Sequence, residues 1–544
     1  MEAAVVAASA AAAAAKEAAV AASAAAATAA KEAAAAATTA MEAAAAASAA
    51  ALNAKESAVV AATAGEAAAA AAAQASKKRK FHSINDQEDE PPGSGTVDDQ
   101  DHISRLPDAV LGSIVSLLPT KEGARTQAIS RRWRPLWRSA PLNLVVDYKL
   151  ECKGQTTIEI IRKILSEHPG PAHRFSFWLL VSDCADEIGG WLGSQALDNL
   201  QELEITYGRL VADRKTVYLL PSSTFRFAPT LRVAKFHKCN FPNFIVPEFP
   251  CLKQLTLDRV TISEDVLQGI ISGCSALESL ELKDNRGIAR LCISSQTLKS
   301  LGFCADRMSR GIFLQELVIE DAPLLERLLP LDPEYGPPTI RIISTPKLKI
   351  LGMLSEDIAE LHFGTTVFQK MIAVGLTTKI YTMRVLVLDS VGPNLDAVVN
   401  FIKCFPRLER LYVIFQPHSH PWMVMNNARK YDPLDPVECL ELHLKKVVLK
   451  NYDGTKSPSI DFTKFFVLNA KVLKEMKITL PYHRQDKWFA NQHGLLRIKH
   501  RASRDARIEL ECGSKDYFTH NTNTHDLSMD DPFDMPSSGC YKCS

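Results

Sequence analysis

Cysteine and histidine are the residues of this chain whose chemistry would be easiest to use, because thiolates and imidazoles are the usual nucleophiles and metal ligands. The chain has 12 cysteines and 14 histidines. Cys540 and Cys543 form a single Cys-x-x-Cys pair, and His418 and His420 flank a serine in a loop bounded by prolines. A zinc site needs further Cys or His ligands at fixed spacing, and neither group has them nearby. We therefore expect no metal site and no cofactor.

A catalytic role for the cysteines is not indicated, because a nucleophilic thiol needs a neighbouring base and a lowered pKa. Several cysteines lie in segments rich in apolar residues, such as 236–241 and 272–277. This placement is typical of reduced, buried thiols. The sequence also has no glycine-rich phosphate-binding loop. We predict no catalytic residues, which favours a binding protein over an unrecognised enzyme.

Charge is balanced over the whole chain, with 63 basic against 62 acidic residues and a net charge of +1. This balance argues against general attraction to nucleic acid or an anionic membrane, so we expect neither as a partner. Basic charge is concentrated at Lys77, Lys78, Arg79 and Lys80, before an acidic stretch without Lys or Arg. Such a cluster fits a nuclear import signal. No signal peptide or membrane span is indicated, so we expect the protein in the nucleus, the cytoplasm or both.

Residues 1–76 are almost entirely alanine, interrupted by Lys-Glu pairs. Alanine favours helix, but this tract has no large side chains from which to build a core. We interpret it as a helical or fluctuating low-complexity extension, followed by a solvated linker. The 544 residues leave room for two or more folded units beyond it.

The composition changes at Ile103 to Leu, Val, Ile, Trp and Arg. Apolar residues recur at steps of three and four between Pro107 and Pro119, which predicts an amphipathic helix between these prolines. A second helix from Thr120 and a basic, aromatic element at 130–137 should follow. A segment of about 45 residues cannot bury all of this apolar surface alone. The apolar ridge therefore predicts a groove on a partner protein.

The same segment carries a specific series of motifs. They are Leu106-Pro107, Val110-Leu111, Ile114, Leu117-Leu118-Pro119, Arg125, Ser130, Arg132-Trp133 and Leu136-Trp137. Together they resemble the F-box, a three-helix module that inserts into the Skp-family adaptor of an SCF ubiquitin ligase and thereby reaches its cullin and RING subunits. The adaptor-binding positions that this resemblance implies are Leu106, Pro107, Val110, Leu111, Ile114, Leu117, Leu118, Pro119 and Trp133.

Two other interpretations of this segment stay open. The helices could form an N-terminal cap of the next domain. Alternatively, Arg131, Arg132, Arg134 and Arg138 could line a helix that reads DNA. The tryptophans and the acidic linker fit a protein partner better than DNA.

A Leu-x-x-Leu-x-Leu pattern recurs after the F-box-like segment, with the alternation expected for short strands. Clear copies begin at Leu200, Leu252 and Leu277, and others follow from Leu298 to Leu473. Asn285 stands three residues past the last apolar position of a copy, where leucine-rich repeats place a small polar residue that bonds main chain. Stacked repeats would make one core with a parallel sheet along the concave side. The uneven spacing predicts an irregular solenoid.

The variable positions of these strands would form the exposed face of the sheet, where such solenoids bind partners. Mixed charge and polarity favour a folded protein or peptide over a polyanion. A plain solvated face is the alternative for any single residue. The predicted substrate-binding residues are Lys253, Gln254, Thr256, Glu278, Ser279, Glu281, Gln315 and Glu316.

Two later stretches resemble further parts of plant F-box proteins. Residues 364–371 are similar to the linker region of grass F-box/LRR proteins. Residues 439–480, with Leu444 to Leu449 and Tyr452-Asp453-Gly454, resemble the FBD domain. The pattern there predicts a strand, a turn, a helix at 460–469 and a strand, which would cap the open end of the solenoid.

We therefore predict an α/β chain in which a small three-helix F-box precedes an irregular leucine-rich-repeat solenoid with an FBD-like cap. The expected parts are an extension at 1–76, a basic cluster and linker at 77–100, the F-box at 101–147, the repeats at 148–438, the cap at 439–511 and a disordered tail at 512–544. The expected function is the substrate-recognition subunit of an SCF-type E3 ubiquitin ligase, acting on an unknown protein. The alternative is a nuclear protein-binding module without a ligase role.

Overall fold

The computed structural model describes most of the chain after residue 106. The described residues are 103, 106–118, 120–146, 157–168, 171–179, 185–208, 218–243, 246–305, 312–332, 336–374, 378–392, 394–415, 432, 434–481, 486–512 and 523–534. The alanine-rich extension, the basic cluster from Lys77 to Lys80, and Cys540 and Cys543 lie outside them, as do His418 and His420. Residues Pro107–Ser544 form one unit, which is described here by itself.

Short helices begin this unit: α2 (Asp108–Ser116), α3 (Thr120–Arg125), the 3-10 segment η1 (Thr126–Ala128) and α4 (Trp133–Ser139). Helix α2 starts directly after Pro107, as the sequence predicts, because proline presets the backbone angle of a helix start and lacks the N–H that would be unpaired there. Leu111 and Val115 supply the buried side of α2, and Leu136 and Trp137 supply that of α4.

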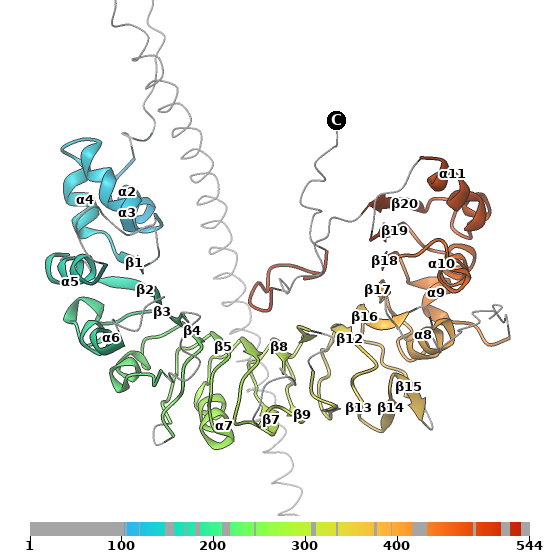
Figure 1. Cartoon of the computed structure of the whole chain (residues 1–544), viewed down its shortest axis with the longest axis horizontal. Coiled ribbons are helices and arrows are strands. Elements are labelled where there is room, and N and C mark those ends of the chain that lie inside the picture. The colour runs from blue at the N-terminus through green and yellow to red at the C-terminus, as the bar shows by residue number, and fades with distance from the viewer. Residues whose placement is uncertain are drawn as a thin grey trace, which may run out of the picture. The chain divides into compact units, whose positions relative to one another are not determined.

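The described residues after α4 build a parallel sheet of 14 strands in which each strand pairs with the next in the order given. The strands are β1 (Leu142–Val146), β2 (Ala172–Leu179), β3 (Glu202–Tyr207), β4 (Val233–His237), β5 (Gln254–Asp258), β6 (Ser279–Lys283), β8 (Ser300–Cys304), β10 (Arg327–Pro330), β12 (Ile350–Leu354), β16 (Val385–Gly392), β17 (Arg410–Phe415), β18 (Lys446–Lys450), β19 (Glu475–Leu480) and β20 (Arg507–Cys512). The sheet curves along its length and forms the concave side of the solenoid (Figure 1).

A leucine ladder explains why neighbouring repeats stack. Leu255, Leu280, Leu301, Leu328 and Leu351 stand in register on consecutive strands and are buried. Each repeat covers the leucine of the next, so one core runs along the whole solenoid.

The predicted role of Asn285 in this stacking is confirmed. Its side-chain oxygen accepts from the Val260 amide at 2.9 Å and its nitrogen donates to the Leu257 carbonyl at 2.9 Å, so the buried turn keeps its hydrogen bonds.

A second sheet of six strands lies among the described residues. Its strands are β7 (Arg290–Ser294), β9 (Glu316–Asp321), β11 (Thr339–Ile342), β13 (Glu360–Phe363), β14 (Thr366–Gln369) and β15 (Ile372–Val374). This sheet corrects one expectation, because the repeat copy that begins at Leu314 supplies β9 and not a strand of the concave sheet. Strand β10 takes the place in the concave sheet between β8 and β12.

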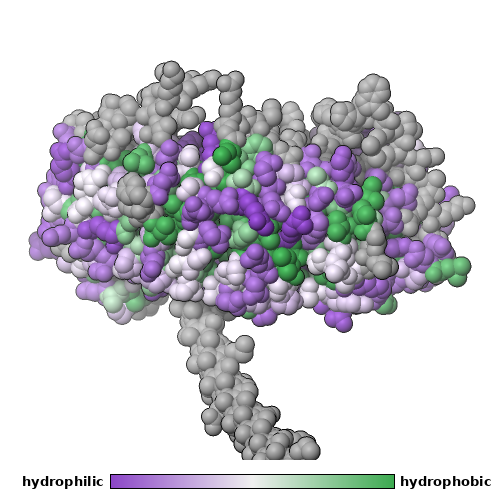
Figure 2. Space-filling model, turned by 90° about the horizontal axis from the view of Figure 1, so that it is seen from below, coloured by the Kyte–Doolittle hydropathy of each residue, from purple (hydrophilic) through white to green (hydrophobic). Residues whose placement is uncertain are grey.

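Helices and 3-10 segments lie on the convex side (Figure 1). They are α5 (Thr157–Glu167), α6 (Ala185–Leu192), α7 (Glu264–Gly273), α8 (Leu395–Ile402), α9 (Glu438–Leu442), α10 (Ser457–Asn469), α11 (Asp486–Leu495), η3 (Gln195–Leu197), η4 (Ser222–Phe227) and η5 (Ile498–His500). Polar side chains are interspersed with apolar ones over this side (Figure 2). Within the described residues, no helix combines the length and the apolar character that a membrane crossing requires.

The C-terminal part differs from expectation in two ways. Strand β18, helix α10 and strand β19 follow the predicted order, but they extend the parallel sheet to β20 and do not close its end. The prediction of a disordered tail is wrong for residues 523–534, which lie against the concave sheet.

Candidate protein-binding surfaces

The helical module of residues 107–140 leaves apolar side chains in solvent. Val110 is 42% exposed, Leu117 is 73% exposed and Ile129 is 62% exposed. Val110 and Leu117 are seven residues apart, which places them on one side of α2. These three residues, called the ridge below, are exposed apolar side chains of the kind found at protein contacts.

The other predicted adaptor-binding residues divide by burial. Leu111 and Trp133 are buried inside the module, so in this structure they support the ridge and are not part of its surface. Ile114, Leu118 and Leu106 are half-buried, and Pro107 is exposed. Pro119 lies outside the described residues.

The module is attached to the first strands of the solenoid by polar and aromatic contacts. The Thr120 hydroxyl donates to the Asn143 carbonyl and accepts from the Val145 amide, both at 2.9 Å. The His168 ring lies edge-on to Trp137 and its Nε2 is 3.0 Å from the Trp137 carbonyl oxygen. The module therefore covers the N-terminal end of the solenoid, as the cap interpretation expects, yet the ridge stays exposed.

Six of the eight predicted substrate-binding residues lie on or beside neighbouring strands of the concave sheet. Gln254 and Thr256 belong to β5, Ser279 and Glu281 belong to β6, and Lys253 and Glu278 directly precede these strands. Gln315 and Glu316 do not share this surface, because β9 belongs to the second sheet. The expectation that all eight line one face is therefore wrong.

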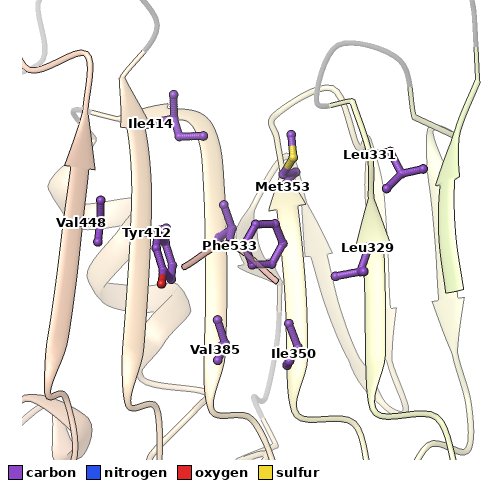
Figure 3. Packing of buried hydrophobic residues seen from close by; sticks show 10 residues of the cluster. Leu329, Leu331, Ile350, Met353, Val385, Tyr412, Ile414, Val448 and Phe533 are labelled. Atoms are coloured by element: carbon purple, nitrogen blue, oxygen red, sulfur yellow. The ribbon is translucent and has the colours of Figure 1, made fainter. Parts of the chain in front are cut away.

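The concave face changes from polar to apolar along the sheet. Strands β5 and β6 present Thr256 and Ser279, whereas β10 to β18 present a cluster of buried apolar side chains around Phe533 of the C-terminal segment (Figure 3). The sheet residues of this apolar cluster are Leu329, Leu331, Ile350, Met353, Val385, Val387, Tyr412, Ile414 and Val448. Sequence reasoning missed this cluster, although Val385-x-Val387 and Tyr412-x-Ile414 show the alternation.

Cations stand in one register row beside the apolar cluster. Arg327 pairs with Ile350, which pairs with Val385, which pairs with Arg410, which pairs with Lys446. Burial lowers the pKa of Arg410, but Asp531 more than offsets this effect and the net pKa is raised. Burial opposes the charge of Lys446 in the same way, and hydrogen bonds to Asp534 and Glu475 raise its pKa. Both side chains therefore stay cationic.

Residues 523–534, called the C-terminal segment below, cross this face. His525 contacts the Thr256 hydroxyl at 2.8 Å and the Ser279 hydroxyl at 2.7 Å. Arg327 donates to the main-chain carbonyls of Asp526 at 2.7 Å and Leu527 at 3.2 Å, and also to that of Met529. The two predicted residues Thr256 and Ser279 thus contact a segment of the same chain.

The end of the segment is held by two aspartates. The buried Asp531 carboxylate accepts from the Tyr412 hydroxyl at 2.8 Å and from Arg410 at 3.1 Å, while its other oxygen accepts from the Phe533 amide at 3.0 Å. Asp534 forms an ion pair with Lys446 at 2.7 Å. These bonds satisfy a carboxylate that would otherwise be costly to bury.

Metal binding and reactive cysteines are the other kinds of chemistry to consider for the described residues. No cluster of three or more His, Cys, Asp or Glu side chains suited to a metal ion occurs among them. Burial raises the pKa of the Cys239 and Cys439 thiols to about 12, so both stay protonated and unreactive at neutral pH. Their burial agrees with the sequence-based expectation.

Family models match two parts of the chain. Residues 188–413 match the model described as FBD-associated F-box protein At5g56370, LRR repeats. Residues 432–478 match the FBD model, which covers β18, α10 and most of β19. Neither match includes the helical module.

Curated relatives come from Arabidopsis thaliana. F-box/FBD/LRR-repeat protein At5g44980 is 31% identical over 221 residues, which is 37% of this chain and 48% of the relative. FBD-associated F-box protein At1g66310 is 26% identical over 58% of this chain and 65% of its own length. Putative FBD-associated F-box protein At1g61330 is 24% identical over 70% of this chain and 91% of its own length.

The alignments thus span about half to two thirds of the first two relatives and most of the third. Their names combine the features found here, which are leucine-rich repeats followed by an FBD segment. The chain therefore belongs to the plant family of F-box/FBD/LRR-repeat proteins.

Proposed function

We propose that this chain is a substrate-recognition subunit of an SCF-type E3 ubiquitin ligase. The ridge of the helical module docks into a Skp-family adaptor, which connects the chain to the cullin and RING subunits. The concave face of the solenoid binds a protein substrate. In this role the chain positions a substrate and contributes no catalytic residue of its own.

The exposure of Val110, Leu117 and Ile129 carries the proposal. The module is already attached to the solenoid through Thr120 and Trp137, so its folding does not require apolar side chains on its outer side. The exposed ridge therefore favours a second protein that covers it. The family membership supports the same reading, because the relatives are named as F-box proteins.

The test is co-purification of the full chain with a Skp-family adaptor, comparing wild type with Leu117→Asp. An aspartate at a desolvated apolar contact should cost about 3 kcal/mol or more, so the complex should weaken at least 100-fold. Leu434→Asp is the matched control, because Leu434 is 94% exposed and lies far along the chain. It should bind the adaptor like wild type.

Leu111 is a poor choice for this test. Its side chain is fully buried, so Leu111→Asp would unfold the module whether or not an adaptor binds there. Circular dichroism should show that Leu117→Asp keeps the wild-type fold. A wild-type chain that fails to bind the adaptor would refute the proposal, and salt-sensitive DNA binding lost on replacing Lys77 to Lys80 with alanine would favour the nuclear alternative.

A further inference from the structure

We propose that the concave face is a peptide-binding site for an acidic segment with an Asp-x-Phe-Asp core, and that residues 523–534 occupy it until a substrate carrying such a segment displaces them. The inference deepens the proposed function and rests on it in one respect, the identity of the displacing ligand as a substrate. The site itself follows from the contacts of the C-terminal segment.

The charges of the segment and the face are complementary. Residues 523–534 contain Asp526, Asp530, Asp531 and Asp534 and no Lys or Arg. Two of these aspartates form ion pairs with the face, Asp531 with Arg410 and Asp534 with Lys446, and Arg327 adds a third positive charge to it. A ligand with basic residues at these places would be repelled, so the surface selects an acidic peptide.

The first half of the segment is held mainly through its main chain. Arg327 is only 5% exposed, and its guanidinium donates to three consecutive or nearly consecutive carbonyl oxygens, those of Asp526, Leu527 and Met529. Every peptide has these acceptors. The contact therefore fixes the main chain of a ligand without reading its side chains, apart from the polar residue that meets Thr256 and Ser279.

The second half is read through side chains. Phe533 is 4% exposed, and its ring centroid lies 6.0 Å from that of Tyr412 inside the apolar cluster. Gly352 makes room for it, since a Cβ atom on Gly352 would collide with the Phe533 ring. Asp531, two residues earlier, is bound by Tyr412 and Arg410. The surface thus specifies an aspartate, a spacer and an aromatic residue.

The segment binds to the concave face and is not part of the repeat core. It contributes no strand to either sheet, and its contacts are with concave side chains such as Thr256, Arg327 and Tyr412. The leucine ladder, including the buried Leu328 and Leu351, lies on the alternate positions of the same strands, whose side chains point to the opposite face of the sheet from the segment. Release of the segment would leave the solenoid core intact and expose the apolar cluster.

Because the C-terminal segment is tethered to the face that it occupies, its docking regulates which free peptides can bind there. A ligand on the same chain competes at an effective concentration on the order of mM, so a free peptide binds only when its own affinity or concentration exceeds this competition. Substrates with a weak segment would be excluded, and those with a strong or multivalent one admitted.

The test uses the full chain and a fluorescein-labelled peptide with the sequence of residues 523–534. In the double variant Asp531→Asn, Phe533→Ala the chain's own segment loses both side-chain anchors. We expect the labelled peptide to bind this variant at least tenfold more tightly than it binds wild type, as measured by fluorescence polarisation, because the tethered competitor is weakened.

Adjacent aspartates provide the matched control. Asp530 is exposed while Asp531 is buried, so a chain with Asp530→Asn should bind the peptide like wild type. Peptides with Asp531→Asn or Phe533→Ala should bind the double variant at least tenfold more weakly than the unchanged peptide, whereas the Asp530→Asn peptide should bind normally. Equal binding of all four peptides would overturn the inference.

A second variant separates release from binding. Gly352→Leu fills the place of the Phe533 ring, so it should free the segment, seen as faster hydrogen exchange across 523–534, and bind no peptide. If the double variant shows a free segment by exchange and still binds no peptide, the inference fails. A concentration-dependent dimer that Phe533→Ala dissociates would place the segment on a second copy and would also overturn it.

The peptide assay contains no adaptor, and the adaptor assay contains no peptide. Loss of adaptor binding in Leu117→Asp with normal peptide binding would support two separate sites. Failure of the peptide assay alone would remove this inference and leave the adaptor proposal standing.

Discussion

The hydroxyl of Tyr412 offers a single-atom test of how the C-terminal segment is held. Tyr412→Phe removes the donor that lies 2.8 Å from the Asp531 carboxylate and leaves the ring in the apolar cluster. Burial, together with Asp531, raises the pKa of Tyr412, so the hydroxyl is protonated and donates over the whole working range. A hydrogen bond to a charged group contributes about 1.5–3 kcal/mol, so the docking equilibrium should fall roughly 10- to 150-fold.

Hydrogen exchange detected by mass spectrometry measures this change directly. In Tyr412→Phe the amides of 523–534 should exchange faster, while those of β16, β17 and β18 keep their wild-type protection because the strand pairing is unaltered. Tyr381→Phe is the control, since Tyr381 is 48% exposed and should show wild-type exchange in the segment. Unchanged protection of the segment in Tyr412→Phe would refute the assignment of Asp531 as an anchor.

Three further predictions concern pH and stability. Burial lowers the pKa of His525 from 6.5 to about 4, with Lys235 and Lys283 adding to the shift and Glu281 opposing it. The docked histidine is therefore neutral, so docking is fully present above pH 6.5 and should weaken by roughly tenfold per pH unit as the pH falls towards 4, measured by direct binding of the labelled peptide to the double variant Asp531→Asn, Phe533→Ala. Asn285→Ala should lower the unfolding free energy by about 2–3 kcal/mol because it leaves the Val260 amide and the Leu257 carbonyl buried without a partner, while Asn243→Ala, at an exposed asparagine, should leave the denaturation midpoint unchanged. Gly123→Ala places a Cβ 2.5 Å from the Trp137 ring and should cost about 1–3 kcal/mol, whereas Gly112→Ala, with open space around it, should be neutral or stabilising, and thermal melts of the two variants check the difference.

Local patterns account for the parts of the fold that were predicted correctly. Helix α2 follows from the three- and four-residue spacing after Pro107, and strands such as β5 and β6 follow from alternating leucines. The turn bonds of Asn285 follow from its offset after the repeat. Each of these depends on residues within one helix or one repeat, where spacing and propensity decide the outcome.

Other features of the fold depended on tertiary contacts between elements and not on local patterns. The copy at Leu314 has the spacing of a concave strand, yet it pairs with β7 and β11 in the second sheet. Leu111 belongs to the same amphipathic pattern as Leu117, but α2 and α4 pack so that Leu111 is buried and Leu117 is exposed. The pattern identifies the apolar stripe, and only packing decides which part of it is left for a partner.

The sequence by itself determined a repeat solenoid preceded by an amphipathic helical segment, because short-range periodicity specifies both. Only the tertiary structure decided the fate of residues 523–534, whose single phenylalanine among aspartates resembles a disordered tail. The Arg327 contact to Asp526 joins positions 199 residues apart, and Phe533 is buried by strands from several repeats. An acidic segment gains nothing from folding alone, and it becomes ordered here because the curved sheet gathers cations and apolar side chains that lie far apart along the chain.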